Sequence, residues 1–284
     1  MKQLLVLSGK GGTGKTTVAC ALIKLSRCQA FADCDVDAPN LHLVLKQLSD
    51  PVRTDYYGFG KAVIDQTKCL QCGLCEQNCH FGAIRNGLTD FYKCEGCGLC
   101  TELCPVKAIK LVNYSSGDLI LYQSAEKVFS TAQLKMGSGA SGKLVTTVKK
   151  NLTQAAPETS LAIIDGSPGI GCPVIASISG VNLVLIVTEP TVSGIHDMKR
   201  IFDTARHFGV KYTACINKYD VNLSNTEEIE QFCGENGIPV VGKIPLDETV
   251  PHAVNHGKSI ADYPESPAGK AVASIWKELK TYIK

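Results

Sequence analysis

Eight cysteines between residues 69 and 104 form two runs with the same spacing. They are Cys69, Cys72, Cys75 and Cys79 in the first run and Cys94, Cys97, Cys100 and Cys104 in the second. Thiolates bind both zinc and iron–sulfur clusters, so the spacing has to distinguish the two. Three cysteines at Cys-x2-Cys-x2-Cys spacing are typical of a [4Fe–4S] cluster, whereas zinc usually takes two Cys-x2-Cys pairs. Iron–sulfur ligation is therefore the prediction, and zinc is the alternative.

Each cluster is expected to take three sulfurs from one run and the fourth from the other, as in two-cluster bacterial ferredoxins. The predicted ligands are Cys69, Cys72, Cys75 and Cys104 for cluster 1, and Cys94, Cys97, Cys100 and Cys79 for cluster 2. The second run repeats the first at an offset of 25 residues (Cys69 to Cys94), which indicates a duplicated half-domain. All-cysteine cubanes usually have low reduction potentials, so electron transfer is the predicted role and a purely structural role is the alternative.

A glycine-rich segment near the N-terminus has the pattern of a phosphate-binding loop. Backbone N–H groups of such a loop curl around phosphate oxygens, while Lys15 neutralises phosphate charge and Thr16 offers its hydroxyl to Mg²⁺. The predicted nucleotide contacts are Gly11, Gly12, Thr13, Gly14, Lys15, Thr16 and Thr17. A glycine-rich turn that binds no ligand is the alternative.

The elements around these motifs predict an α/β fold: a mostly parallel sheet flanked by helices, with a small inserted α+β domain. Strands are expected at Gln3–Leu7, Gln29–Cys34, Asp118–Tyr122, Leu161–Ile164, Val181–Thr188, Tyr212–Ile216 and Val240–Ile244. Helices are expected at Thr16–Arg27, Lys143–Ala155, Ser193–Phe208, Thr226–Asn236 and Pro267–Tyr282, with a flexible segment over 137–142. The predicted domains are a nucleotide-binding core over 1–60 and 113–284 and a ferredoxin-like insert over 61–112.

Composition limits the classes of function. The chain has 284 residues, 44% of them apolar, which is ample for a globular core. A net charge of +2 without a Lys/Arg cluster argues against a nucleic-acid partner. No apolar run approaches the ~18 residues of a membrane span, and no cleavage site follows the N-terminal strand. Fourteen cysteines without a leader favour a reducing cytoplasm, in which thiolates bind metal.

Lys10, a second lysine inside the loop, makes the chain resemble the MinD/ParA/Mrp (deviant Walker A) P-loop ATPases, which include the nitrogenase iron protein. The resemblance covers essentially all of the chain outside the insert. It implies hydrolysis of ATP with Mg²⁺ by a homodimer that closes across the nucleotide. In that family the lysine reaches the nucleotide of the opposite subunit, so Lys10 would supply charge to the transition state as an arginine finger does. An exposed loop lysine without this role is the alternative.

Three further residues resemble the family's switch segments. Asp35 matches the residue that orients the attacking water near Mg²⁺, and Asp165 ends an apolar strand in the Walker B arrangement for holding Mg²⁺. Gly169 would sense the γ-phosphate with its N–H group. Asp37 is either another acid near Mg²⁺ or a turn cap before Pro39. The implied catalytic residues are Lys10, Lys15 and Asp35, and the implied Mg²⁺ ligands are Thr16, Asp35 and Asp165.

Two residues near the end of the predicted sheet match the family's base-binding positions. They are Asn217 and Pro245, each of which follows a predicted strand. Lys218 and Asp247 lie beside them, but a simple strand-end turn competes with a ligand role for both.

The other six cysteines divide into two groups. Five lie in helical or strand patterns and are expected to be ordinary buried thiols: Cys20, Cys28, Cys34, Cys215 and Cys233. Cys172 follows Gly169 closely, and in the nitrogenase iron protein a cysteine at the matching place ligates a cluster that bridges the dimer. The second cysteine that such a bridge needs is absent from residues 137–142. Cys172 therefore faces a dimer axis or cargo metal, or it is buried filler.

The best overall match is a subgroup of MinD-like ATPases with an inserted ferredoxin domain, sometimes labelled after cobyrinic acid a,c-diamide synthase. The segments Ser141–Val145 and Gly171–Val174 also resemble that subgroup. The resulting hypothesis is a dimeric ATPase that couples nucleotide to electron transfer toward an unidentified redox or cofactor-assembly protein. The alternatives are an assembly factor that loads metal cofactors, and a positioning ATPase whose clusters are structural or redox-sensing. Membrane cycling would use the apolar stripe of residues 267–284, which is more typical of a helix that packs on the core.

Overall fold

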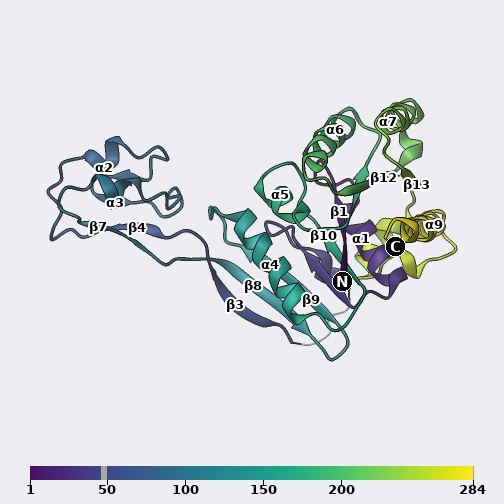
Figure 1. The fold of residues 1–284 in the computed structure, drawn as a ribbon, viewed down its shortest axis with the longest axis horizontal. Coiled ribbons are helices and arrows are strands. Elements are labelled where there is room, and N and C mark those ends of the chain that lie inside the picture. Colours follow the sequence, from purple (N-terminus) through teal and green to yellow (C-terminus); the bar gives the residue numbers. More distant parts are fainter. Residues whose placement is uncertain (46–49, 284) are drawn as a thin grey trace.

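A nine-stranded sheet forms the body of the protein in the computed structural model, which describes residues 1–45 and 50–283 (Figure 1). Residues 46–49 and 284 of the predicted core lie outside the described residues. The strand order is β13-β12-β11-β1-β10-β2-β9-β8-β3. The seven strands from β13 to β9 run parallel, whereas β8 and β3 are antiparallel to their neighbours. The strands are β1 Lys2–Leu7, β2 Ala30–Asp33, β3 Val52–Tyr57, β8 Ser115–Gln123, β9 Val128–Leu134, β10 Leu161–Asp165, β11 Leu183–Thr188, β12 Lys211–Asn217 and β13 Val240–Ile244. The α/β fold class is confirmed.

Helices cover both faces of this sheet and create two apolar cores. One core lies under α4 (Ser141–Ala155), α5 (Cys172–Ile178), α6 (Val192–His207) and α7 (Leu223–Glu235). The other lies under α1 (Lys15–Ser26) and α9 (Pro267–Ile283), with α8 (Thr249–Asn255) nearby. Because both faces are covered, the central strands are apolar along their whole length, as β11 illustrates with six buried residues in succession.

The apolar stripe of α9 packs on the core, as predicted for a docking helix. Val272, Ile275 and Leu279 are buried in the second apolar core, and Trp276 packs against it. Within the described residues, no helix is both long enough and apolar enough to cross a bilayer.

The structure contains several elements that the sequence pattern did not indicate. Strand β3 was missed because five of its six residues are exposed, so it has no apolar alternation. Strand β9 and helices α5 and α8 were also not predicted. The segment expected to be flexible, 137–142, ends inside the first turn of α4, which begins at Ser141.

The cysteine-rich segment folds as a separate small unit at one end of the molecule, beyond the β3–β8 edge of the sheet (Figure 1). Strand β4 (Lys61–Ile64) pairs with β7 (Ile109–Val112), and β5 (Ile84–Arg85) pairs with β6 (Leu88–Thr89). Two short helices, α2 (Leu74–Gln77) and α3 (Leu99–Leu103), follow Gly73 and Gly98, which have positive φ angles of 76° and 80°. The duplication seen in the sequence is therefore also present in the backbone.

Candidate functional site

The phosphate-binding loop joins β1 to α1 and lines an open cavity of about 610 Å³. The cavity is bordered by Ser8, Gly11, Gly12, Gly14, Lys15, Thr16, Thr17, Asp35, Asp37, Ala38, Asn40, Ser167, Pro168 and Pro173. Gly14 has a φ of 89°, and a Cβ atom there would collide with the side-chain amide of Asn217. The loop therefore needs glycine at this position for both backbone and space.

Lys15, Thr16 and Asp165 form a compact polar cluster at the base of the cavity. Lys15 Nζ lies 2.6 Å from Asp165 Oδ1, and the Thr16 hydroxyl donates to Asp165 Oδ2 at 2.6 Å. Both members of the ion pair are buried. Burial alone would lower the pKa of Lys15, but the carboxylates of Asp165, Asp33 and Asp35 together hold that pKa above its ordinary value. The groups predicted to hold phosphate and Mg²⁺ thus satisfy one another.

Asp33 is a buried acid to which the sequence analysis gave no role. It ends β2 opposite Asp165 in the parallel register, and its carboxylate accepts N–H bonds from Asp35, Asn40 and Leu41 at 2.9–3.0 Å. Burial and the nearby Asp165 charge raise the pKa of Asp33 to about 7. Its place at a strand end was the signal that could have revealed it.

Asp35 owes its position to these hydrogen bonds. It is half-buried on the cavity wall, and burial raises the pKa of its carboxyl group although the Lys15 charge opposes this. Asp37 lines the same cavity and is exposed. The side-chain hydrogen bonds that hold this turn come from Asp33 and not from Asp37.

Lys10 is bound within its own chain. Its Nζ lies 2.7 Å from Glu189 Oε1 and donates to the hydroxyls of Thr191 and Ser193. Glu189 also contacts Lys218 at 3.2 Å, and hydrogen bonds from the two lysines lower the pKa of Glu189 even though burial alone would raise it. Glu189 belongs to none of the sequence motifs, although its place just after β11, which lies next to β1, is a usable signal.

The remaining predicted nucleotide contacts lie outside the cavity wall. The Gly169 N–H donates to the Ser8 carbonyl at 3.0 Å, so it must leave that partner before it can meet a phosphate. The Asn217 amide donates to the Thr13 carbonyl at 2.8 Å, and half-buried Pro245 follows β13. Asp247 accepts the Ala268 N–H at the start of α9, which supports the strand-end reading for that residue.

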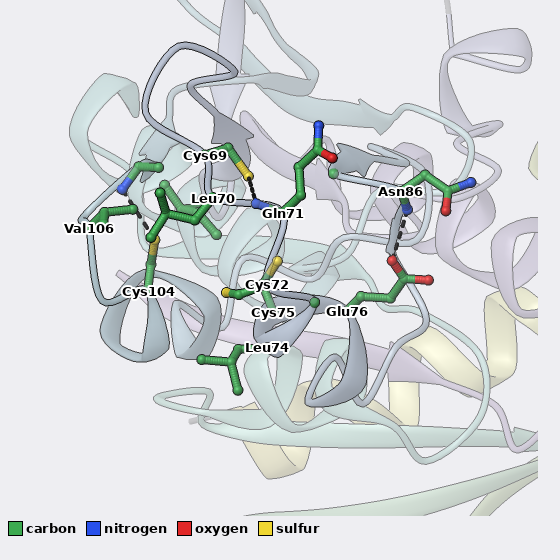
Figure 2. A pocket seen from close by; sticks show the side chains of 14 residues that line it. Cys69, Leu70, Gln71, Cys72, Leu74, Cys75, Glu76, Asn86, Cys104 and Val106 are labelled. Carbon is green, nitrogen blue, oxygen red and sulfur yellow. Dashed lines mark hydrogen bonds between the residues drawn. The ribbon is translucent and has the colours of Figure 1, made fainter.

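The four cysteines assigned to cluster 1 line one cavity of about 420 Å³, together with Glu76 and Asn86 (Figure 2). Those cysteines are Cys69, Cys72, Cys75 and Cys104. The four assigned to cluster 2 line a neighbouring cavity, to which Cys75 also contributes; they are Cys79, Cys94, Cys97 and Cys100. The fold therefore gathers the cysteines into the same two sets that the crossed arrangement requires.

Backbone N–H groups point at several of these sulfurs. Ala83 donates to Cys79 Sγ at 3.3 Å, and Ala108, at the matching repeat position, donates to Cys104 Sγ at 3.2 Å. Such hydrogen bonds stabilise thiolates and are one means by which proteins tune iron–sulfur clusters. Among the described residues, no three His, Cys, Asp or Glu side chains converge on a single metal ion. In a cubane each of the four thiolates binds a different iron, so the sulfurs need not converge on one metal position. The two sets of cysteines therefore suit [4Fe–4S] clusters.

The other cysteines are divided by exposure. Cys20, Cys28, Cys34, Cys215 and Cys233 are buried, as predicted. Burial raises the pKa of the Cys28 and Cys233 thiols to about 11, so these groups remain protonated. Cys172 is exposed at the start of α5, which rules out the interpretation as buried filler.

Most of the chain matches the model of one known protein family. Residues 4–260 match the model of the CobQ/CobB/MinD/ParA nucleotide binding domain. The chain belongs to this family. It is a P-loop ATPase of the MinD/ParA type, so the predicted enzyme class is confirmed.

Relatives of this MinD/ParA-type ATPase include proteins from archaea. An uncharacterized protein of Methanocaldococcus jannaschii is 30% identical, covering 99% of this chain and 97% of that relative. An iron-sulfur cluster carrier protein of Pyrococcus horikoshii is 25% identical, covering 99% of this chain and 86% of that relative. The septum site-determining protein MinD of Pyrococcus horikoshii, solved with Mg-ADP, has a TM-score of 0.61 at 17% identity, covering 98% and 95% of the two chains. This last similarity concerns the fold.

Proposed function

We propose that this MinD/ParA-type ATPase works as a dimer in which bound nucleotide positions the cysteine-rich unit for electron transfer to a partner protein. The two cysteine sets would hold [4Fe–4S] clusters, which supply one-electron transfer when bound. Lys15 and Thr16 would bind phosphate and Mg²⁺, with Asp165 holding Mg²⁺ through water. Asp35 would orient the attacking water, and Lys10 would act on the partner's nucleotide.

This proposal depends mainly on the contacts of residues 137–142, which touch the cysteine-rich unit on one side and α5, next to the nucleotide cavity, on the other. On one side, a Cβ at Gly139 would collide with the Glu95 carboxylate, and a Cβ at Gly137 would lie 3.1 Å from the Tyr92 ring. Glu95 lies between the cluster 2 cysteines Cys94 and Cys97. This side of the segment therefore touches the cysteine-rich unit directly.

On its other side, the same segment touches the element that follows the nucleotide cavity. A Cβ at Gly142 would lie 3.1–3.2 Å from Cys172, the first residue of α5. Ser167 and Pro168, a few residues earlier, line the nucleotide cavity. A shift of the 167–171 loop on ATP binding would therefore press on α5, the glycine segment and then the cysteine-rich unit.

Three contacts beside this segment hold the chain that leads from β3 into the cysteine-rich unit. Lys143 Nζ donates to the Gly58 carbonyl at 3.4 Å and lies over the Phe59 ring at 5.7 Å. The Tyr56 hydroxyl donates to the Ala140 carbonyl at 3.4 Å. These contacts are few and partly exposed, so a modest nucleotide-driven change is enough to alter them.

Electron delivery by anaerobically purified, chemically reduced protein tests the proposal. The rate of transfer to a low-potential acceptor should differ between ATP-bound and nucleotide-free protein, and Lys15→Ala should abolish the difference. Equal rates in both states would refute the gating, and protein without iron and sulfide would refute the redox role.

Cluster delivery is a second candidate. It is supported by the similarity to iron-sulfur cluster carrier proteins and by the exposure of Cys72 and Cys97. A carrier would lose its cluster stoichiometrically to an apo-acceptor, whereas an electron-transfer protein would retain it. The membrane-cycling alternative is less well supported because the α9 stripe is occupied by the core.

A further inference from the structure

Lys61 is a buried lysine that contacts Cys94. Lys61 is 4% exposed, and no described carboxylate forms an ion pair with it. Its Nζ donates to the Cys94 carbonyl at 2.6 Å and lies 5.9 Å from the centre of the Tyr114 ring. A buried cation is costly unless an anion compensates it, so this position calls for negative charge nearby.

The backbone beside Lys61 contacts the same cysteine. The Ala62 N–H approaches Cys94 Sγ at 3.5 Å, while the lysine holds the Cys94 carbonyl. Strand β4 thus brings one full positive charge and one N–H group to a single predicted ligand of cluster 2. Both would stabilise added negative charge on a group bound there.

In the part of the chain that the structure describes, the residues lining the first cysteine cavity include no lysine or arginine. Every other lysine or arginine of residues 61–112 is exposed: Lys68, Arg85, Lys93, Lys107 and Lys110. The residue 25 positions after Lys61 is the neutral Asn86, whose side chain points away from the cysteine sulfurs in Figure 2. Each cavity also has one acid on its wall, Glu76 in the first and Glu95 in the second. The acids are therefore matched, whereas a buried lysine contacts a cysteine of the second set, Cys94.

We propose that Lys61 is a tuning residue that makes cluster 2 the more easily reduced of the two. The inference rests on the proposed redox function. The couple concerned is the addition of one electron to each cluster, with no bond made or broken. Because buried charges are screened much less than exposed ones, Lys61 outweighs the surface lysines near either run. Cluster 2 is also the one beside Glu95 and residues 137–142, so the electron would rest on the side that faces the ATPase core.

Anaerobic redox titration followed by EPR tests this in the full chain, with dithionite as the electron donor. The wild-type protein should show two separate one-electron couples. Lys61→Gln keeps a hydrogen-bond donor but removes the charge, so the higher couple should fall while the lower one stays. The reduced-to-oxidised ratio of the affected cluster at fixed potential should drop about tenfold, equivalent to about 59 mV for one electron.

Two variants serve as controls. Lys61→Arg retains the charge and should retain both potentials. Lys93→Gln removes the exposed charge directly before Cys94 and should leave both couples nearly unchanged. Unchanged couples in Lys61→Gln, or equal shifts of both, would overturn the inference while leaving the redox function intact.

A measurement on the wild-type protein keeps the inference testable if Lys61→Gln does not fold. The gap between the two couples should persist as salt is raised, since a buried charge causes it. A gap that closes with salt would overturn the role of Lys61. Protein that contains no iron or sulfide when made without oxygen would overturn the proposed function, and this inference with it.

Discussion

Replacing Glu189 with glutamine should strengthen ATP-dependent dimerisation. In the single chain, Lys10 is held by Glu189 at 2.7 Å and by two hydroxyls. If Lys10 acts on the nucleotide of the partner subunit, this ion pair has to break once in each subunit when the dimer closes. Glu189→Gln removes the charge from the pair but keeps the shape of the side chain, so the closed dimer gains relative to the monomer.

The magnitude follows from the exposure of the two side chains. Lys10 is 28% exposed and Glu189 12%, so the ion pair is partly screened and contributes about 1 kcal/mol. Two such pairs break per dimer, which gives about 2 kcal/mol. That corresponds to a dimer dissociation constant lower by about 30-fold.

Sedimentation velocity with a non-hydrolysable ATP analogue measures this constant. Lys218→Gln is the matched control, because it removes the other cation on Glu189 and leaves Lys10 in place. It should not strengthen the dimer. In a Lys10→Gln background, the Glu189 substitution should have no further effect. Dimerisation that is unchanged or weaker in Glu189→Gln would refute the idea that Lys10 is released from this site to act in trans.

Three further predictions concern stability in the metal- and nucleotide-free protein, measured by urea unfolding. Asp165→Asn leaves the buried Lys15 without its partner and should lower the free energy of unfolding by about 3–5 kcal/mol; a loss below about 1 kcal/mol would contradict this. Because the pKa of Asp33 is raised to about 7 when folded, the native state binds its proton more tightly than the unfolded chain, and stability should fall as pH rises from about 4 to about 7; Asp33→Asn should flatten that dependence. Leu279→Ala should cost about 2–5 kcal/mol, whereas Lys280→Ala should stay within about 0.5 kcal/mol, and similar values for the two would argue against docking of α9.

The sequence was sufficient for those features that depend on short-range patterns. Lys15 and Thr16 lie in a contiguous loop between a strand and a helix, so their place in the cavity follows from local structure. Asp165 was predictable because the carboxyl ends of neighbouring parallel strands meet at one edge of a sheet. The cysteine spacing likewise indicated the two groups of four before any fold was known.

Features that depend on strand order could not be predicted in the same way. The partner of Lys10 is Glu189, and their contact exists because β11 pairs with β1. Burial of Lys61 depends on the pairing of β4 with β7, which closes across the entire cysteine-rich segment. Strand β3 escaped detection for another reason: an exposed edge strand needs no apolar face, and its pattern is that of a loop.

The pairing of β3 with β8 has a consequence for how the protein matures. These strands pair at the edge of the main sheet, although the whole segment between Tyr57 and Ser115 separates them in the sequence. That segment has to become compact before the two strands can pair. An unstructured connection of that length imposes an entropic cost on closure, and metal that orders the cysteines would relieve it. Protein made without iron should therefore have an incompletely paired β3–β8 edge with exposed backbone N–H and C=O groups. It should self-associate more readily than protein that contains iron.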